Sequence, residues 1–359
     1  MIYNSYEGAV SFVRRPRAWG ENAFSVDSNE GRNPYGKKGM KTIIYVFSGT
    51  GNTLKVAGLY RKNLGEEDTE LYRVFGKNER VPDPNGFDAV GFAYPIHAFN
   101  APKPMLDFCK NLPEVNPGKY AFILKTSGEG LHFNDCSSQK IIGILKKKGF
   151  DVALERHIVM PYNMIFRHTD GMAKQMWIYA HALAELNCRE IVSRKKEKVR
   201  QPLYKTWYAP LFRIEQPFAR LHGKLFKADK EKCVGCGLCV RNCPMGNIRI
   251  EDGRAKFGGN CALCMACSFF CPTDAVSVGI FRGWKVHGAY PLDALEKDPA
   301  VPFPYLDGRE KGVYKIYRKY YRECDERLAA AGMKIADYVR FGEPEAAEEE
   351  EALPLLPGT

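Results

Sequence analysis

The stretch TIIYVFSGTGNT, residues Thr42–Thr53, joins an apolar run to a loop of small, hydroxyl-bearing residues. Thr42–Phe47 predicts a buried strand, and Asn52–Asn63 predicts the helix that follows the loop. Glycines let a backbone approach a ligand closely, and the start of a helix directs free N–H groups at an anion. We therefore predict that this loop binds a phosphate group. The residues expected to bind it are Ser48, Gly49, Thr50, Gly51, Asn52 and Thr53.

Two common phosphate-binding motifs are excluded by the letters of this loop. A P-loop requires Gly-Lys-Ser/Thr at its end, and that triplet does not follow here. A dinucleotide fingerprint requires a third glycine at the position that Leu54 occupies. Because the loop contains no Lys or Arg, hydroxyls and backbone amides would bind the phosphate with little charge neutralisation.

The pattern of strand and helix continues beyond the loop. Further strands are predicted at Glu70–Phe75, Phe87–Tyr94, Lys119–Lys125 and Asp151–Met160. Helices are predicted at Pro104–Leu112, at Asp135–Lys148 with Asp135 as N-cap, and at Lys174–Lys198. Five strands separated by helices indicate an α/β, doubly wound, five-stranded parallel sheet covered on both faces.

Eight of the twelve cysteines lie in two repeated blocks. CVGCGLCVRNCP spans Cys233–Pro244 and CALCMACSFFCP spans Cys261–Pro272, so the copies match at an offset of 28 residues. Each has the spacing C-x2-C-x2-C-x3-C-P, which does not fit the paired C-x2-C motifs of a four-cysteine zinc site. The other four, Cys109, Cys136, Cys188 and Cys324, are interpreted as small buried hydrophobic residues.

The repeated blocks resemble the bacterial ferredoxins that hold two [4Fe–4S] clusters. In that family three close cysteines ligate one cluster and the fourth ligates the other. The resemblance assigns Cys233, Cys236, Cys239 and Cys271 to the first cluster. It assigns Cys261, Cys264, Cys267 and Cys243 to the second. Asn247–Phe257 predicts a hairpin between the blocks, with Asp252-Gly253 as its turn. A small α+β ferredoxin domain is therefore expected after the parallel sheet.

SGTGNT after a strand, with Ala57 farther along, resembles the FMN-binding loop of flavodoxins. The resemblance implies a flavin ring between the loops that follow the third and fourth strands. No Trp or Tyr lies in either loop, PIHAFN or TSGEG. Tyr162, after the fifth strand, is a further candidate for ring contact. The residues expected around the ring are Pro95, His97, Phe99, Asn100, Thr126, Ser127 and Gly128.

These patterns predict six segments, and Met40 before the first strand is a candidate for the natural start of the chain. The flavodoxin-like FMN-binding domain is expected at 40–200 and the ferredoxin domain at 229–280, joined by a basic, aromatic linker at 201–228. A disordered extension at 1–39 precedes them. A C-terminal extension with a helix near 313–331 occupies 281–342, and an acidic disordered tail occupies 343–359.

Charge is distributed unevenly along the chain, whose net charge is +11. From Arg189 to Lys232, 13 Lys/Arg stand against 5 Asp/Glu, a difference of +8. We interpret this stretch as a solvated helix face and linker that could dock an acidic redox protein, rather than as a nucleic-acid site; attachment to a membrane surface is the alternative. No apolar run is long enough for a membrane span, and no secretory signal is apparent. We expect a cytoplasmic location and leave the oligomeric state open.

The whole pattern resembles the flavodoxin–ferredoxin fusion proteins of anaerobic bacteria and archaea. The resemblance implies electron transfer between FMN and two [4Fe–4S] clusters, with electrons exchanged with a redox protein such as an acidic ferredoxin, a flavodoxin or a reductase. Two alternatives remain open. The chain could be a flavin-dependent reductase of a small substrate fed by the clusters. It could instead be a ferredoxin module on a flavin-free scaffold. The residues do not decide whether the chain is an enzyme.

Overall fold

The structure is a computed structural model that describes residues 39–74, 80–130, 132–197, 215–308, 310 and 312–339. Residues 1–38 of the predicted N-terminal extension, residues 201–214 of the basic linker and the acidic tail lie outside these residues. Within the described part of the chain, no helix is long and apolar enough to cross a membrane.

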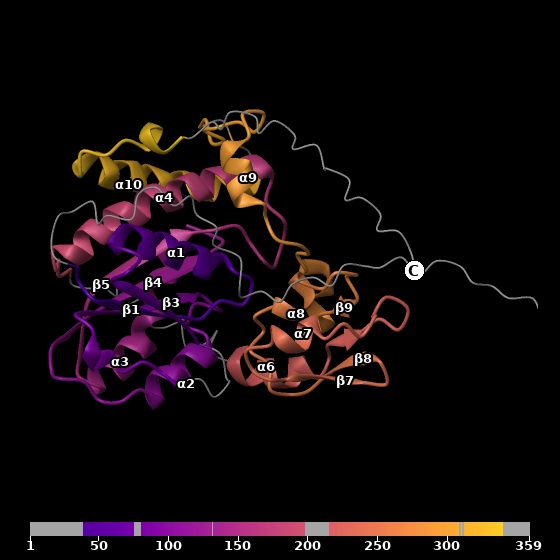
Figure 1. Cartoon of the computed structure of the whole chain (residues 1–359). Coiled ribbons are helices and arrows are strands. Elements are labelled where there is room, and N and C mark those ends of the chain that lie inside the picture. Colours follow the sequence, from indigo (N-terminus) through magenta and orange to yellow (C-terminus); the bar gives the residue numbers. More distant parts are fainter. Residues whose placement is uncertain are drawn as a thin grey trace, which may run out of the picture.

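A five-stranded, all-parallel sheet forms the centre of the first domain (Figure 1). Its strand order is β2-β1-β3-β4-β5, which is the flavodoxin-like order of doubly wound folds. The predicted fold class is thereby confirmed, and the predicted strand ends agree to within two residues. The strands are β1 (Thr42–Val46), β2 (Thr69–Arg73), β3 (Ala89–Pro95), β4 (Lys119–Ser127) and β5 (Phe150–Val159).

Helices cover both faces of this sheet, with α1 (Asn52–Leu64) and α4 (Asp170–Val192) on one side and α2 (Lys103–Asn111) and α3 (Gln139–Lys147) on the other (Figure 1). Every residue of β1 is buried, as a strand covered on two faces requires. The strand order reverses between β1 and β3. The loops that follow these two strands therefore diverge and open a crevice at the carboxyl edge of the sheet.

The start of α3 differs from the prediction that Asp135 caps the helix. A 3-10 segment, His132–Ser138, comes first, and α3 begins only at Gln139. The buried Lys125 ammonium accounts for the difference, because it donates to the carbonyls of Asn134 at 2.8 Å and Asp135 at 3.4 Å. These carbonyl oxygens are thus drawn to a buried cation at the start of the segment. The long helix α4 also begins earlier than predicted, after Thr169, whose hydroxyl accepts from the Met172 N–H.

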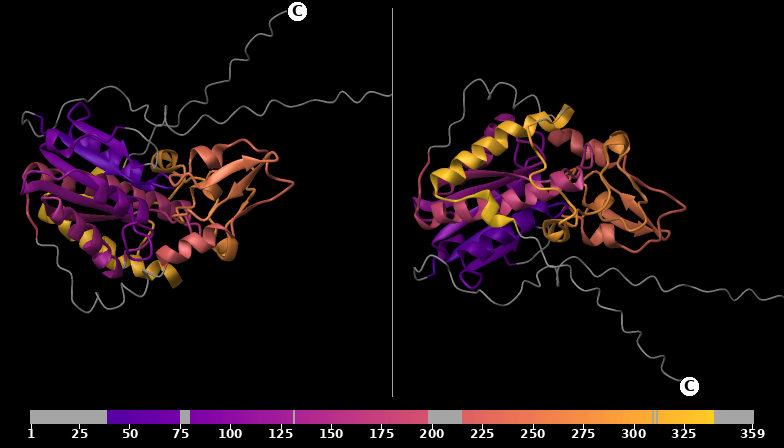
Figure 2. Two further views of the ribbon diagram at one scale, coloured as in Figure 1. Left: turned by 90° about the horizontal axis from the view of Figure 1, so that it is seen from below. Right: turned by 90° about the horizontal axis from the view of Figure 1, so that it is seen from above.

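The second domain is built on two short antiparallel sheets and short helices (Figures 1 and 2). The hairpin of β7 and β8 is confirmed, with Asp252 and Gly253 at φ 50° and 69°, as a type I′ turn requires. A small apolar core that includes Phe226, Val276 and Val278 lies beneath the cysteine loops. The elements are α6 (Glu215–Gly223), β6 (Lys227–Ala228), α7 (Leu238–Arg241), β7 (Ile248–Glu251), β8 (Arg254–Phe257), α8 (Ala266–Phe269) and β9 (Val276–Ser277).

After the second domain the chain returns to the first and packs on α4 (Figure 2). Tyr317, Tyr321 and Leu328 of this segment are buried in the same core as the helices α1 and α4. The predicted helix near 313–331 is present, although its first turn is 3-10 and α10 begins at Tyr317. The 3-10 turn Gly279–Trp284 still belongs to the second domain, because Phe281 packs on its small core. The elements after it are the 3-10 turns Gly312–Ile316 and Ile335–Tyr338, and the helices α9 (Leu292–Lys297) and α10 (Tyr317–Ala330).

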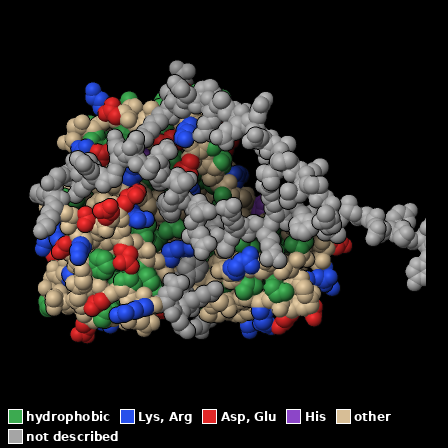
Figure 3. All heavy atoms as spheres, viewed as in Figure 1, with side chains coloured by type: hydrophobic (Ala, Val, Ile, Leu, Met, Phe, Trp, Pro, Cys, Tyr) green, Lys and Arg blue, Asp and Glu red, His purple; other side chains and the backbone are tan. Residues whose placement is uncertain are grey.

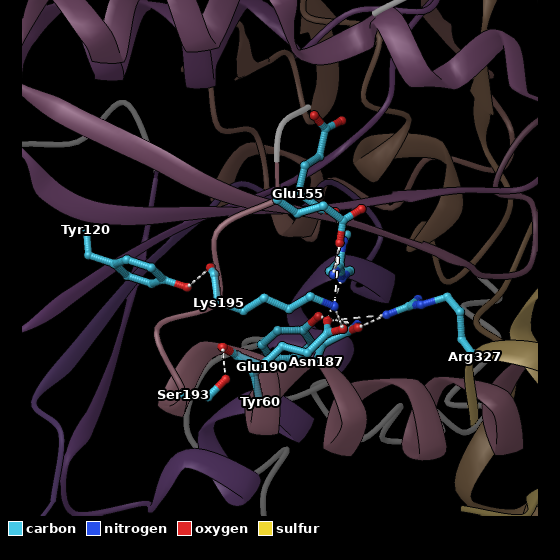
Figure 4. A network of polar contacts seen from close by, with 10 residues as sticks. Tyr60, Tyr120, Glu155, Asn187, Glu190, Ser193, Lys195 and Arg327 are labelled. Atoms are coloured by element: carbon cyan, nitrogen blue, oxygen red, sulfur yellow. Dashed lines mark hydrogen bonds and ion pairs between the residues drawn. The ribbon is translucent and has the colours of Figure 1, made fainter. Parts of the chain in front are cut away.

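A polar network also attaches α10 to the first domain (Figure 4). Glu190 of α4 accepts from Arg156 of β5 at 2.7 Å and from Arg327 of α10 at 3.4 Å. Arg327 also donates to the Asn187 side chain at 2.9 Å, and Asn187 donates to the Tyr60 hydroxyl at 2.8 Å. One carboxylate thus balances guanidinium groups from two different elements.

Candidate functional site

A cavity of about 540 Å³ opens at the carboxyl edge of the parallel sheet. Open α/β sheets bind ligands at this edge, beside the point where the strand order reverses. Of the predicted ligand-binding residues, Gly51 and Asn100 do not line the cavity. Those that do are Ser48, Gly49, Thr50, Asn52, Thr53, Pro95, His97, Phe99, Thr126, Ser127 and Gly128.

The loop after β1 presents backbone N–H groups to this cavity. Gly51, at φ 99°, is the N-cap of α1 and has no side chain with which to cap it. Instead the Ser48 hydroxyl accepts from the N–H of Gly51 at 3.2 Å and of Leu54 at 3.4 Å. The N–H groups of Asn52 and Thr53 have no acceptor among the described residues. A phosphate group fits here, because unpaired N–H groups at a helix start are its usual partners.

The polar side chains of this loop face in different directions. The Thr50 hydroxyl accepts from the Asn163 side chain at 2.8 Å, so its own proton is free to be donated into the cavity. The Asn52 side chain donates to the Pro161 carbonyl at 2.7 Å. The Thr53 hydroxyl is buried against Thr126 at 2.7 Å. The amide of Asn52 therefore attaches the loop to the segment after β5, and the hydroxyl of Thr53 attaches it to β4. The backbone contributes most of the phosphate contacts available.

The loop after β3 is a tight turn beside the loop of residues 47–51 that joins β1 to α1, which is called the phosphate loop from here on after its predicted ligand. His97 and Asn100 exchange two backbone hydrogen bonds of 2.9 Å, while Ala98 and Phe99 have positive φ values of 41° and 56°. Asn100 is buried and donates from its side chain to the Ala98 carbonyl, which explains why it supports the turn without lining the cavity. Burial lowers the pKa of His97 to about 4, so its imidazole is neutral near pH 7.

The loop after β4 carries polar groups that the sequence did not indicate. Glu129 and Asn134 line the cavity together with the predicted Ser127. The Glu129 carboxylate accepts from the Tyr162 hydroxyl at 2.7 Å, and Asn134 donates to the Ser127 hydroxyl at 3.1 Å. Tyr162, the further candidate named from the sequence, therefore lies at the cavity and is held there by Glu129.

The eight clustered cysteines surround two small cavities, four at each. Cys233, Cys236, Cys239 and Cys271 line one, and Cys243, Cys261, Cys264 and Cys267 line the other. These are the two sets that the ferredoxin resemblance assigned to two clusters. Backbone N–H groups donate to three of the sulfur atoms at 3.2 to 3.3 Å, as ligand thiolates of iron–sulfur clusters require.

A single metal ion fits these cysteines poorly. Among the described residues, no three His, Cys, Asp or Glu side chains are grouped as the ligands of one ion would be. Zinc would require four thiolates about 2.3 Å from one centre, whereas a cluster of several irons holds its cysteines farther apart. Burial and the neighbouring thiols raise the pKa of Cys239 to about 11. The Cys239 thiolate therefore needs a cationic group beside it, which an iron–sulfur cluster would supply.

The phosphate loop and the second cysteine set are in direct contact. A Cβ atom on Gly49 would lie 2.4 Å from the Cys264 carbonyl oxygen and 2.8 Å from its Cβ. Leu263 and Met265, on either side of Cys264, line the large cavity itself, as do Phe281 and Trp284 of the second domain. The two sets of cysteines are also neighbours, because the Cys239 thiol is close enough to contribute to the raised pKa of Cys267.

The residues that line the cavity from the second domain could not be identified from the sequence. They lie more than 200 positions beyond the phosphate loop, and no spacing rule links them to it. The sequence did contain one sign that the second cysteine block differs from the first. In the second cysteine block, Leu263 and Met265 stand where the first block has Gly235 and Gly237.

Comparison with known proteins identifies the second domain. The family model described as a 4Fe-4S binding domain matches residues 226–249. A ferredoxin of Methanothermococcus thermolithotrophicus is 39% identical over 54 residues, which are 14% of this chain and 90% of that protein. An uncharacterized ferredoxin of Methanocaldococcus jannaschii is 36% identical over 62 residues, which are 16% of this chain and 80% of that protein.

Other likenesses are more partial. Two other relatives, both longer than these ferredoxins, match over a small part of their length. The chain spans 29% of an uncharacterized protein of M. jannaschii and 21% of an RNA polymerase subunit of Methanosarcina mazei. A structure of Fusobacterium nucleatum flavodoxin bound to flavin mononucleotide is 19% identical, with a TM-score of 0.27, and the match covers 32% of this chain and 69% of that one. By its cysteine-rich domain the chain belongs to the ferredoxin family, and it carries that domain beside an α/β domain with the flavodoxin-like strand order.

Proposed function

We propose that this chain transfers electrons between an FMN, bound in the large cavity, and two [4Fe–4S] clusters. Ferredoxin domains pass single electrons through their clusters, which makes electron transfer the general function of the chain. FMN would supply the ability to exchange either one or two electrons. The observation that carries the proposal is the contact between Gly49 of the phosphate loop and Cys264 of the second cysteine set.

The residues proposed to bind FMN divide into two groups. The N–H groups at the start of α1, with the hydroxyls of Ser48 and Thr50, would bind its phosphate. The turn at His97–Asn100 and the loop at Thr126–Glu129 would border its ring. The neutral His97 can donate or accept a hydrogen bond there, while the Glu129–Tyr162 pair positions a carboxylate at the cavity wall.

The order of the clusters follows from their positions. The set that includes Cys264 contacts the cavity, whereas the set that includes Cys236 lies farther away and Cys236 itself is exposed. We propose that the set containing Cys264 faces the flavin and the set containing Cys236 faces the partner. Val234, between Cys233 and the exposed Cys236, has 66% of its surface accessible and offers an apolar contact beside that cluster.

A protein partner for the exposed cluster should be acidic. From Lys227 to Phe257, seven Lys/Arg stand against four Asp/Glu, and the Arg241 side chain donates to the Cys236 carbonyl at 3.2 Å. Figure 3 shows, on one face, blue side chains over this domain with red ones interspersed. We expect the rate of reduction of an acidic ferredoxin to fall as ionic strength rises, because screening weakens the attraction. Equal rates at low and high salt would contradict an electrostatically guided partner.

The decisive measurement is the cofactor content of protein purified without oxygen. We expect about eight irons, about eight sulfides and about one FMN per chain. Eight irons with no flavin, even after addition of FMN, would instead support a ferredoxin module on a flavin-free scaffold. Turnover of a small substrate by the flavin-loaded protein would support the reductase alternative.

A further inference from the structure

The large cavity is closed on one side by the ferredoxin domain. Its first-domain wall consists of loops that follow β1, β3, β4 and β5, and these loops contain no Trp. The opposite wall is made by Leu263, Met265, Phe281 and Trp284 of the second domain. A planar ligand that enters this cavity therefore meets the loops of the first domain on one side and apolar side chains of the second domain on the other.

Two of these side chains occupy backbone positions that normally require glycine. Leu263 and Met265 have φ values of 51° and 59°, in the left-handed region. Their counterparts in the first cysteine block are Gly235 and Gly237, at 63° and 74°. A left-handed conformation is unfavourable for residues with a Cβ, so side chains here are retained against a local cost. Leu263 and Met265 line the cavity, which supplies a reason for keeping them.

The aromatic part of this wall is firmly attached to the first domain. The rings of Phe281 and Trp284 stack with centroids 5.6 Å apart and an angle of 21° between their planes. The Trp284 carbonyl accepts from the Ile165 N–H at 2.7 Å, and Lys285 forms a β-bridge with Met164. Even so, Trp284 has 51% of its surface accessible. A large, exposed aromatic side chain at a cavity edge is typical of a ligand contact.

We infer that the flavin site is composite, with Trp284, Leu263 and Met265 of the ferredoxin domain covering the isoalloxazine ring that the first domain borders. This inference rests on the proposed binding of FMN. It assigns to the second domain the Trp contact that neither ring loop of the first domain contains. It also makes FMN affinity depend on how the two domains dock.

The test is FMN binding to full-length protein from which flavin has been removed and whose clusters are intact. Flavin fluorescence is titrated, and iron per chain is measured for every variant. We expect Trp284→Ala to weaken FMN binding by about tenfold, because the flavin ring loses its stacking contact with the indole. Trp284→Phe should restore most of the affinity. Phe218→Ala, at an aromatic of the same domain that does not line the cavity, should bind FMN as the native chain does.

A second variant removes another side chain of the cavity wall. Met265→Gly keeps the left-handed backbone without strain, because glycine adopts it freely. We expect FMN binding to weaken severalfold. Because Met265 is buried in the small core of the second domain, the thermal midpoint should fall as well, and FMN affinity is measured in folded protein with its full iron content. Unchanged FMN affinity in both Trp284→Ala and Met265→Gly, in protein whose native form binds FMN, would overturn the composite site. A native chain that binds no FMN would instead overturn the proposed function.

Discussion

At the level of single residues, His168 connects the cavity to the C-terminal segment. It is 3% exposed, and its Nδ1 accepts from the Tyr162 N–H at 3.2 Å. Its Nε2 therefore bears the proton and donates to the Tyr317 hydroxyl at 2.9 Å, which donates to the Gly128 carbonyl at 2.5 Å. Burial lowers the pKa of His168 to about 4 from 6.5, so the folded protein holds the neutral ring.

This pKa predicts how stability changes with pH. Between pH 6.5 and 4 the unfolded chain binds a proton at His168 that the folded chain does not. The neutral His168 ring thus makes its full contribution to the free energy of unfolding above pH 6.5. This contribution of roughly 3 kcal/mol is lost progressively as pH falls toward 4. We expect His168→Gln to flatten the decline of unfolding free energy, measured with denaturant, over this range. Parallel pH profiles for the variant and the native chain would contradict this role.

At the level of elements, the loop before α1 requires a glycine for its contact with the second domain. A Cβ on Gly49 would meet the Cys264 backbone, which cannot move without shifting a proposed cluster ligand. We expect Gly49→Ala to lower the free energy of unfolding by about 1–3 kcal/mol, the usual cost of overpacking.

Gly143 provides the matched control within a helix. It is exposed in α3, and a Cβ there meets no atom within 4 Å. Gly143→Ala should therefore raise stability by about 0.5–1 kcal/mol, as alanine is the better helix former. Thermal midpoints that shift in the same direction for both variants would show that the contact between Gly49 and Cys264 is unimportant.

At the level of the whole molecule, the polar network around Glu190 fastens the C-terminal segment to the sheet and α4 (Figure 4). Burial disfavours the charged form of Glu190, but hydrogen bonds from Arg156 and Lys195 outweigh it and hold its pKa below the usual value. Glu190→Gln would leave the Arg156 guanidinium, which is 8% exposed, less well neutralised. We expect a loss of about 3 kcal/mol and faster proteolysis within α10.

Glu326 of α10, which lies outside the network around Glu190, provides the control for the Glu190 substitution. Glu326 pairs with Arg322 at 3.9 Å, and both side chains are 69% exposed. Glu326→Gln should change stability by less than about 0.5 kcal/mol, because water screens such pairs. Equal effects of the two substitutions, measured by denaturant unfolding, would contradict a special role for Glu190.

Local patterns predicted much of this molecule. Buried parallel strands appear as continuous apolar runs, so the five strands from Thr42 onward could be placed from the sequence. The cysteine spacing is likewise local, because three ligands of one cluster must lie within a short loop. The predicted N-terminus of α3 was wrong. The Lys125 ammonium that binds the carbonyls of Asn134 and Asp135 comes from a strand and not from the neighbouring turn, so the local sequence did not reveal it.

The sequence by itself determined the parallel sheet, the ferredoxin domain after it and the partition of eight cysteines into two sets, since each depends on residues close together in the chain. Only the tertiary structure decided that Cys264 lies against Gly49, that Trp284 lines the cavity, and that α10 completes the first core. These contacts join residues more than 100 positions apart, and packing between whole domains sets them. A periodicity or a spacing rule carries no information about such packing, because it describes one element at a time.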